Sequence, residues 1–251
     1  MSAWLQGRVI ETRAWTDTLF SLRVGLGTGA PPLAFEAGQF VRIALDLGGE
    51  RVARPFSFVN PPADPVLEFY GVIVPGGPLS PALARLKAGD ALHVADNPSG
   101  FLVLAEVPPA EDLWLVATGT GIAPFLSILR TATPWQRYRR VILVHGVRHA
   151  RELVYREMIE EVRRTRSGIF SYIRFVSREN APQALNGRIP AAIADGRLER
   201  AAATELSAAR SHAMLCGNPQ MVTDVTAALA ARGMRKHRRR APGHITVETY
   251  W

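Results

Sequence analysis

The middle of the chain contains a short apolar run that stops at two closely spaced glycines. Leu113 to Ala117 is apolar at every position, which is typical of a strand buried on both faces of a parallel sheet. The turn Gly119-Thr120-Gly121 follows at once, and apolar residues within 125–129 then recur at helical spacing. A strand, a glycine turn and a helix form the first half of a βαβ unit, and the free N–H groups at the start of its helix attract phosphate. The sequence therefore predicts a dinucleotide-binding loop here.

A glycine turn after a strand can also serve packing alone, and the motif by itself leaves that alternative open. Pro124 departs from the G-x-G-x-x-G fingerprint of dinucleotide-binding units. The position of the unit favours nucleotide binding, because this parallel-type unit begins after a first half that has an all-β pattern.

Strands and helices alternate in the rest of the second half. Further strands are expected at 141–145, 172–176, 213–216 and 245–248, and helices at 152–164 and 219–232. Such alternation predicts a doubly wound, Rossmann-like α/β domain with a parallel five-stranded sheet. Its ligand should lie beyond the carboxyl ends of the strands, where the strand order reverses.

The first half instead has six short segments rich in Val, Ile, Leu, Phe and Thr, separated by Gly, Pro and Asp clusters: 5–13, 18–24, 39–45, 51–59, 66–74 and 90–95. One helical stretch at 81–86 interrupts them. This pattern predicts an antiparallel six-stranded β-barrel. We expect two domains, 1–103 and 104–251, with the proline-containing stretch 96–111 between the two patterns.

Two stretches of the first half have unusual chemistry. In Arg54-Pro55-Phe56-Ser57 a guanidinium, a ring and a hydroxyl can serve one flat, phosphorylated ligand. From Tyr70 to Pro81 a strand leads into a Gly-Gly-Pro turn, in which Ser80 is expected to be the N-cap of a helix, with Pro81 at its first position. The alternatives are a barrel strand with one exposed arginine and an ordinary strand–turn–helix connection.

Arginines and a capping signal follow the predicted strands of the second half. Arg148, Ser177-Arg178 and Arg188 come after the second and third strands, where arginine suits a phosphate on the ribose. Asn218 is expected to cap the helix that Pro219 opens. Solvated arginines are the alternative, since the chain has many.

Five motifs together resemble the ferredoxin–NADP⁺ reductase family, over nearly the whole chain and in the family's order. They are Arg54-Pro55-Phe56-Ser57, Gly76-Gly77-Pro78-Leu79-Ser80, Gly119-Thr120-Gly121-Ile122-Ala123-Pro124, Cys216-Gly217-Asn218-Pro219 and Val247-Glu248-Thr249-Tyr250. The compact length and the final Tyr-Trp are similar to the bacterial-type members. The resemblance implies an FAD-containing enzyme that exchanges electrons between NADP(H) and an acidic electron carrier, ferredoxin or flavodoxin.

The resemblance also implies site residues. FAD is expected at Arg54, Pro55, Phe56, Ser57, Tyr70, Val72, Gly77, Pro78, Leu79, Ser80, Thr120, Tyr250 and Trp251. NADP(H) is expected at Gly119, Thr120, Gly121, Arg148, Ser177, Arg178, Arg188, Gly217, Asn218 and Pro219. The expected catalytic residues are Ser57 near flavin N5, Cys216 and Glu248 at the nicotinamide, and Tyr250 on the flavin face.

Three positions depart from the family pattern. Phe56 lacks the hydroxyl of the usual tyrosine, and Pro78 stands where bacterial relatives often carry lysine. Trp251 extends one residue past the terminal tyrosine of plant-type members. We favour Tyr250 as the ring over the isoalloxazine, with Trp251 nearer the adenine.

Composition limits the remaining possibilities. A net charge of +8 fits an acidic protein partner, and the scattered arginines with no recognisable module argue against nucleic acid. The single cysteine excludes an intrachain disulfide and a cysteine-ligated cluster, and no histidine spacing indicates a metal. No long apolar run or signal-peptide pattern occurs, so we expect a cytoplasmic monomer with no membrane contact. The alternatives are a related flavin or oxygenase reductase and a non-catalytic nucleotide-binding module.

Overall fold

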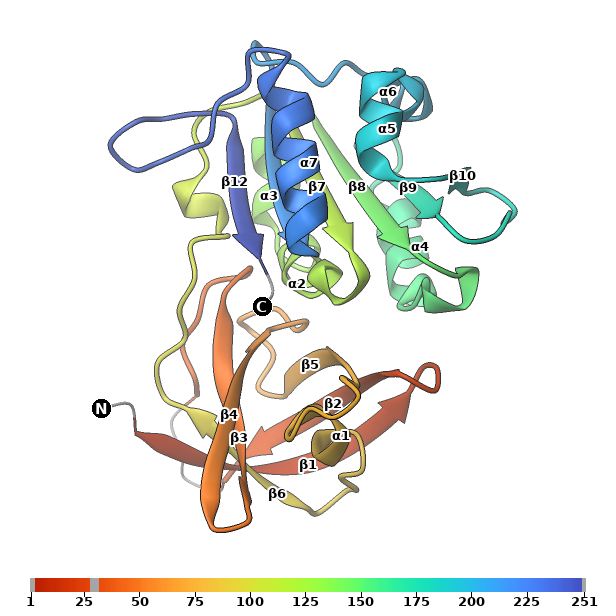
Figure 1. The fold of residues 1–251 in the computed structure, drawn as a ribbon. Coiled ribbons are helices and arrows are strands. Elements are labelled where there is room, and N and C mark those ends of the chain that lie inside the picture. The colour runs from red at the N-terminus through yellow and green to blue at the C-terminus, as the bar shows by residue number, and fades with distance from the viewer. Residues whose placement is uncertain (1–2, 28–31, 250–251) are drawn as a thin grey trace.

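The chain folds into two halves stacked along one seam (Figure 1). The computed structural model describes residues 3–27 and 32–249. The first half contains strands β1 (Trp4–Ala14), β2 (Leu19–Leu26), β3 (Phe40–Leu47), β4 (Glu50–Ser57), β5 (Leu67–Val72) and β6 (Ala91–Ala95). All six were predicted from the sequence, with bounds that differ by a few residues.

The six strands form one antiparallel sheet in the order β4-β3-β6-β1-β2-β5. Its two end strands meet at an isolated antiparallel bridge between Phe58 and Phe69, so the sheet curls back on itself as a barrel does. The interior is apolar, with Leu22, Ile43 and Val94 fully buried. Alternation of inward apolar and outward polar residues in the sequence explains this arrangement.

The second half is a parallel sheet of six strands rather than the expected five. Its order is β10-β9-β8-β7-β11-β12, with β7 (Asp112–Thr118), β8 (Arg140–Val147), β9 (Phe170–Val176), β10 (Leu185–Asn186), β11 (Ser211–Gly217) and β12 (Ile245–Thr249). The additional strand β10 has two residues, which is too short to produce a periodic signal in the sequence.

Helices cover both faces of this sheet, as in a doubly wound fold. On one face, α2 (Ala123–Leu129) and α4 (Arg156–Thr165) pack on a core that includes Leu113, Leu115 and Leu143. On the other face, α5 (Ile189–Ala194), α6 (Arg197–Ala202) and α7 (Pro219–Ala230) pack on Val116, Ile142 and Leu215. A short helix, α3 (Thr133–Arg137), lies between α2 and β8.

Two helix predictions need correction, and three short helices were not predicted. The expected helix at 81–86 is the single turn α1 (Ser80–Leu83). The expected helix at 152–164 begins only at Arg156, because Ala150–Glu152 forms a 3₁₀ turn and Tyr155 has a left-handed backbone. The short helices α3, α5 and α6 are the ones that were not predicted.

The seam between the halves is apolar and continuous. Leu19, Val59 and Tyr70 of the first half belong to the same buried cluster as Phe125 and Ile128 of α2. The two halves therefore share one core at their contact surface.

No helix in the described parts of the chain has both the length and the apolar character that a bilayer crossing requires.

Candidate functional site

The strand order of the parallel sheet reverses between β7 and β11, the position at which doubly wound sheets bind their ligands in a crevice beyond the strand ends. The chain passes from β7 to β8 on one side and later returns to β11 on the other, so the strand order reverses here. In Figure 1 the arrowheads of β7, β8 and β12 point toward the barrel half. The carboxyl ends of the strands, with their predicted ligand-binding loops, therefore face the seam.

Two glycines bring the loops after β7 and β11 into contact. A Cβ built on Gly121 would lie 2.5 Å from the carbonyl oxygen of Cys216, and one on Gly217 would lie 2.5 Å from Thr118 Oγ1. Asn218 N donates to Thr118 Oγ1 at 3.0 Å. Gly121 and Gly217 therefore have a packing role, because a side chain at either position would clash. Their close approach also brings the two predicted nucleotide-binding loops together.

Gly119 has a different environment. Its φ is +53°, and no described atom lies within 4 Å of a Cβ built there. The sequence indicated that the α-helix starts directly after the glycines. Instead, Gly119–Ile122 forms a 3₁₀ turn that leads into α2. An open, left-handed glycine followed by a turn of free N–H groups fits the approach of a phosphate.

The loop after β11 starts a helix as predicted. The Asn218 side chain accepts hydrogen bonds from Gln220 N at 2.9 Å and Met221 N at 3.3 Å, and Pro219 opens the 12-residue helix α7. The N-cap prediction for Asn218 is confirmed.

His145 is a functional candidate that sequence reasoning missed. The ring is fully buried at the end of β8, with Nε2 3.2 Å from the carbonyl oxygen of Gly119 and Nδ1 3.4 Å from Tyr172 Oη. Burial lowers the pKa of His145 to about 4, so the ring is neutral near pH 7. A neutral ring that donates from Nε2 to Gly119 and accepts at Nδ1 holds the loop in place. Its only signal in the sequence was a polar residue at the end of a buried strand.

The three predicted catalytic residues that the structure describes gather at the seam. Cys216 and Glu248 are register partners on the adjacent strands β11 and β12. Ser57, at the end of β4, is the register partner of Phe40. A Cβ on Gly100 would lie 3.2 Å from both Glu248 Oε2 and the Phe40 ring, so Glu248 lies beside the strand pair that carries Ser57.

Glu248 lies in an environment unusual for a carboxyl group. Its Oε1 is buried without a hydrogen-bond partner among the described residues. Burial raises the pKa of Glu248 to about 7, since a charged carboxylate loses hydration there. A carboxyl group that titrates near neutral pH can hold or release a proton at physiological pH.

The predicted flavin stretch lies along the end of β4. Arg54 is exposed, with Nη1 2.7 Å from the carbonyl oxygen of Ala53, and Ser57 is buried. Phe56 is half-buried, and a Cβ on Gly71 would lie 2.9 Å from its ring. Tyr70 instead belongs to the core of the seam, where it stacks edge-on against Tyr155 at 5.5 Å. Val72 is half-buried at the end of β5.

The turn after β5 differs from the prediction in one respect. Ser80 is not the N-cap of α1: it is the first helical residue, and its hydroxyl accepts from Val74 N at 2.9 Å. Gly77 N donates to Val74 O at 3.0 Å, which closes the turn. Pro78 is exposed and Leu79 is buried in the barrel core. An anion here would contact turn N–H groups rather than the end of a long helix.

The arginines predicted for a ribose phosphate follow the carboxyl ends of β8 and β9. Arg178 N donates to Arg148 O at 3.0 Å, and Ser177 Oγ donates to Val147 O at 3.2 Å. Arg188 follows Gly187, whose N–H donates to Val176 O at the end of β9. Arg148, Arg178 and Arg188 are exposed, and none forms an ion pair with any residue described. Their charges are thus available to an anion.

Two of the residues expected at the FAD cannot be placed in the structure. Tyr250 and Trp251 lie outside the described residues, since β12 ends at Thr249. As for metals, the described residues contain no group of three or more His, Cys, Asp or Glu side chains arranged to hold an ion.

Comparison with known proteins agrees with this arrangement. Residues 115–227 match the family model of the oxidoreductase NAD-binding domain. The chain is 48% identical over 252 residues to the flavodoxin/ferredoxin–NADP reductases of Escherichia coli (strain K12) and Shigella flexneri, with 100% of each chain covered. The crystal structure of a ferredoxin NADP⁺ reductase from Neisseria gonorrhoeae with bound FAD and NADP superposes with a TM-score of 0.93 at 30% identity and covers 99% of both chains.

Proposed function

Because this chain belongs to the flavodoxin/ferredoxin–NADP reductase family, we propose that its electron transfer takes place where Ser57, Cys216 and Glu248 converge at the seam. The protein is an oxidoreductase that uses FAD and exchanges electrons between NADP(H) and ferredoxin or flavodoxin. The convergence of these residues from β4, β11 and β12 is the observation that carries the proposal.

We assign FAD to the domain at 1–103 and NADP(H) to the domain at 104–251. The residues fit FAD: Arg54 has an exposed guanidinium for the pyrophosphate, and the half-buried Phe56 ring and the Ser57 hydroxyl follow it at the end of β4. When bound, FAD supplies the capacity to take two electrons as hydride and release them singly. Ser57 would donate a hydrogen bond to the flavin edge, and Tyr70 would contribute backbone rather than ring contacts.

The nicotinamide dinucleotide would lie across the crevice between β7 and β11. The loop Gly119-Thr120-Gly121 and the N-terminus of α7 would hold the pyrophosphate. Arg148, Arg178 and Arg188 would bind the 2′-phosphate that distinguishes NADP(H) from NAD(H). Their lack of acidic partners among the described residues supports this assignment.

Glu248 and Cys216 would shape the pocket for the nicotinamide ring. Cys216 is buried and sits at the strand end that the ring must approach. Glu248 would hold a proton on its buried carboxyl at pH below about 7 and release it above. Such a group can balance charge near the reacting rings without leaving the site.

The electron carrier would be acidic, and the chain would act as a cytoplasmic monomer. The basic run 235–240 is one candidate docking surface, although Arg239 is already paired with Glu106 at 2.6 Å. Arg238 and Arg240 are exposed and form no ion pair with any described residue.

One absorbance experiment tests the proposed function. The purified protein should show a flavin spectrum that NADPH bleaches faster than NADH does, and the reduced protein should pass electrons to ferredoxin or flavodoxin faster than to free FMN. A colourless protein, or equal bleaching by both nucleotides, would contradict it.

A further inference from the structure

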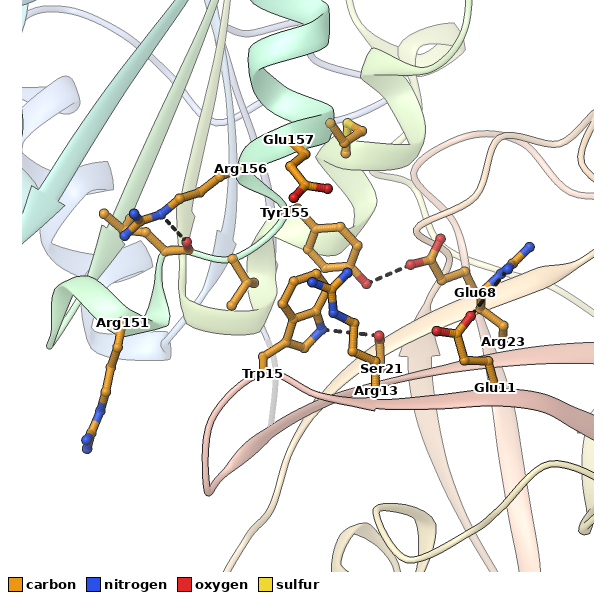
Figure 2. A pocket seen from close by; sticks show the side chains of 13 residues that line it. Glu11, Arg13, Trp15, Ser21, Arg23, Glu68, Arg151, Tyr155, Arg156 and Glu157 are labelled. Atoms are coloured by element: carbon orange, nitrogen blue, oxygen red, sulfur yellow. Dashed lines mark hydrogen bonds and ion pairs between the residues drawn. The ribbon is translucent and has the colours of Figure 1, made fainter.

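Both carboxylate oxygens of Glu68 contact the opposite half of the molecule. Glu68 lies on β5, and its Oε1 accepts a hydrogen bond from Tyr155 Oη at 2.9 Å. Its Oε2 lies 3.5 Å from Arg130 Nη1. Figure 2 shows the Tyr155 hydroxyl directed at Glu68, and both residues line a cavity of about 590 Å³. One side chain of the domain assigned to FAD therefore contacts two residues, Tyr155 and Arg130, of the domain assigned to NADP(H).

Arg130 and Tyr155 each follow, along the chain, a segment that is assigned to NADP(H) binding. Arg130 is the C-cap of α2, the helix that begins directly after the loop Gly119–Ile122. Tyr155 precedes α4, seven residues after Arg148. The contacts of Glu68 therefore bear on the elements assigned to the pyrophosphate and to the 2′-phosphate.

The segment after Ser57 is attached to the same helix. Ser127 Oγ of α2 donates a buried hydrogen bond to Asn60 O at 2.7 Å, and Arg130 Nη1 donates to Val59 O at 3.4 Å. Asn60 Oδ1 in turn accepts from Glu68 N at 2.8 Å. A single short network thus joins the segment after β4, the strand β5 and the C-terminal end of α2, the helix that follows the dinucleotide loop.

Tyr155 has a backbone conformation that needs support from its surroundings. Its φ is +57°, which is rare and unfavourable for a bulky residue. The ring is buried between Trp15 at 4.8 Å and Tyr70 at 5.5 Å. Burial and the Glu68 carboxylate raise the pKa of Tyr155 well above its usual range, so the hydroxyl stays protonated and donates. A residue with an unfavourable backbone conformation, packed between two rings and hydrogen-bonded to Glu68 of the opposite half, points to a requirement for position.

We propose that Glu68 is a positioning residue for hydride transfer: through Tyr155 and Arg130 it sets the placement of the nicotinamide-binding half over the flavin. The inference rests on the proposed function, because it assumes that the two rings meet at the seam. In this role Glu68 acts through its contacts with Tyr155 and Arg130. Since a misplacement of about 1 Å can cost about 100-fold in rate, a loosened contact should affect the transfer step more than binding.

The test measures anaerobic flavin reduction by NADPH in rapid mixing, with the FAD-loaded enzyme. For Glu68→Ala we expect the limiting rate to fall by roughly 10- to 100-fold, with an unchanged dissociation constant for NADPH and unchanged FAD content. Glu68→Gln keeps an acceptor for Tyr155 and should recover part of the rate. Glu157→Ala is the matched control, since Glu157 lines the same cavity, and among the described residues no hydrogen bond or ion pair links it to Glu68, Tyr155 or Arg130.

Two further measurements separate positioning from simple stabilisation. The absorbance of NADP⁺ stacked on the flavin at equilibrium should weaken in Glu68→Ala, although no turnover takes place. Tyr155→Phe is the milder variant, and its effect should be less than additive with that of Glu68→Ala, because both remove the same contact.

The outcomes are distinct. A wild-type limiting rate and stacking spectrum in folded Glu68→Ala would overturn the inference, even if its melting temperature falls. A loss of NADPH affinity at an unchanged limiting rate would also overturn it. If wild-type protein itself is not reduced by NADPH, the proposed function fails instead.

Discussion

Gly121 and Cys216 lie so close together that a Cβ on Gly121 would stand 2.5 Å from the carbonyl oxygen of Cys216 and 2.6 Å from its carbonyl carbon. The obstacle is backbone in the middle of the parallel sheet, which cannot move aside as a flexible side chain can. The contact couples the loop assigned to the pyrophosphate to the strand end assigned to the nicotinamide.

Gly121→Ala should therefore destabilise the protein and weaken nucleotide binding together. Forcing an extra carbon into a packed site costs about 1–3 kcal/mol, and more where backbone must shift. Urea unfolding would show the loss as a lower midpoint at an unchanged slope. Gly27→Ala is the control, because the nearest atom to its added Cβ would be 3.6 Å away. Equal midpoints for both variants would show that the loop can relax.

Replacing Glu248 by Gln should change the pH dependence of stability. The pKa of Glu248 is raised from 4.5 to about 7 in the folded protein, so the folded state binds more protons within that interval. The contribution of Glu248 to stability is thus fully present below about pH 4.5 and is lost as pH rises through 7. Because the side chain is only partly buried, we expect a loss of about 1–2 kcal/mol rather than the full value.

Urea unfolding of wild type and Glu248→Gln at pH 4.5 and pH 8.5 tests this. The variant should gain relative to wild type at the higher pH, because glutamine cannot ionise. A constant difference between the two proteins would mean that Glu248 does not titrate in this range.

Arg178→Ala and Arg188→Ala should impair the use of NADPH while sparing NADH. Each lost charge-assisted contact to the 2′-phosphate costs about 1.5–3 kcal/mol, or about 10- to 150-fold in kcat/KM. Steady-state assays with both nucleotides measure the ratio directly. Arg163→Ala, which removes an exposed arginine paired with Glu160, serves as the control. Parallel losses with NADPH and NADH would refute the assignment.

Electron transfer to an acidic flavodoxin or ferredoxin should slow as salt rises. The net charge of +8 steers an anionic partner, and about 0.15 M salt screens exposed charges beyond about 8 Å. The assay uses saturating NADPH and compares the carrier with an uncharged quinone, whose rate should not change. Arg238→Ala with Arg240→Ala should flatten the salt dependence if the basic run forms the dock. A carrier rate independent of salt would argue against an acidic partner surface.

Much of the fold was predictable because its signals are local. Segments rich in Val, Ile, Leu, Phe and Thr between Gly, Pro and Asp clusters predicted the six barrel strands, and the buried run before Gly119 marked the start of the parallel sheet. Asn218 acted as the predicted N-cap because its hydrogen bonds reach only two and three residues along the chain.

The remaining features depend on contacts between distant residues. Ser80 has the sequence of an N-cap, yet its hydroxyl closes a turn with Val74 instead. The contacts of the buried His145 form only once β7, β8 and β9 lie side by side, and the pairing of Glu68 with Tyr155, 87 residues away, forms only once the sheet and the barrel meet. No periodicity in a single chain can reveal such pairs.

The apolar seam has a consequence for how this molecule can be divided. Leu19, Val59 and Tyr70 are covered by residues of the opposite half, so either half produced alone would expose that surface to water. Either domain expressed alone should therefore aggregate and fold poorly. Calorimetry of the whole chain should show a single unfolding transition. Swapping one half for that of a distant homologue would succeed only if the matching side chains were exchanged with it.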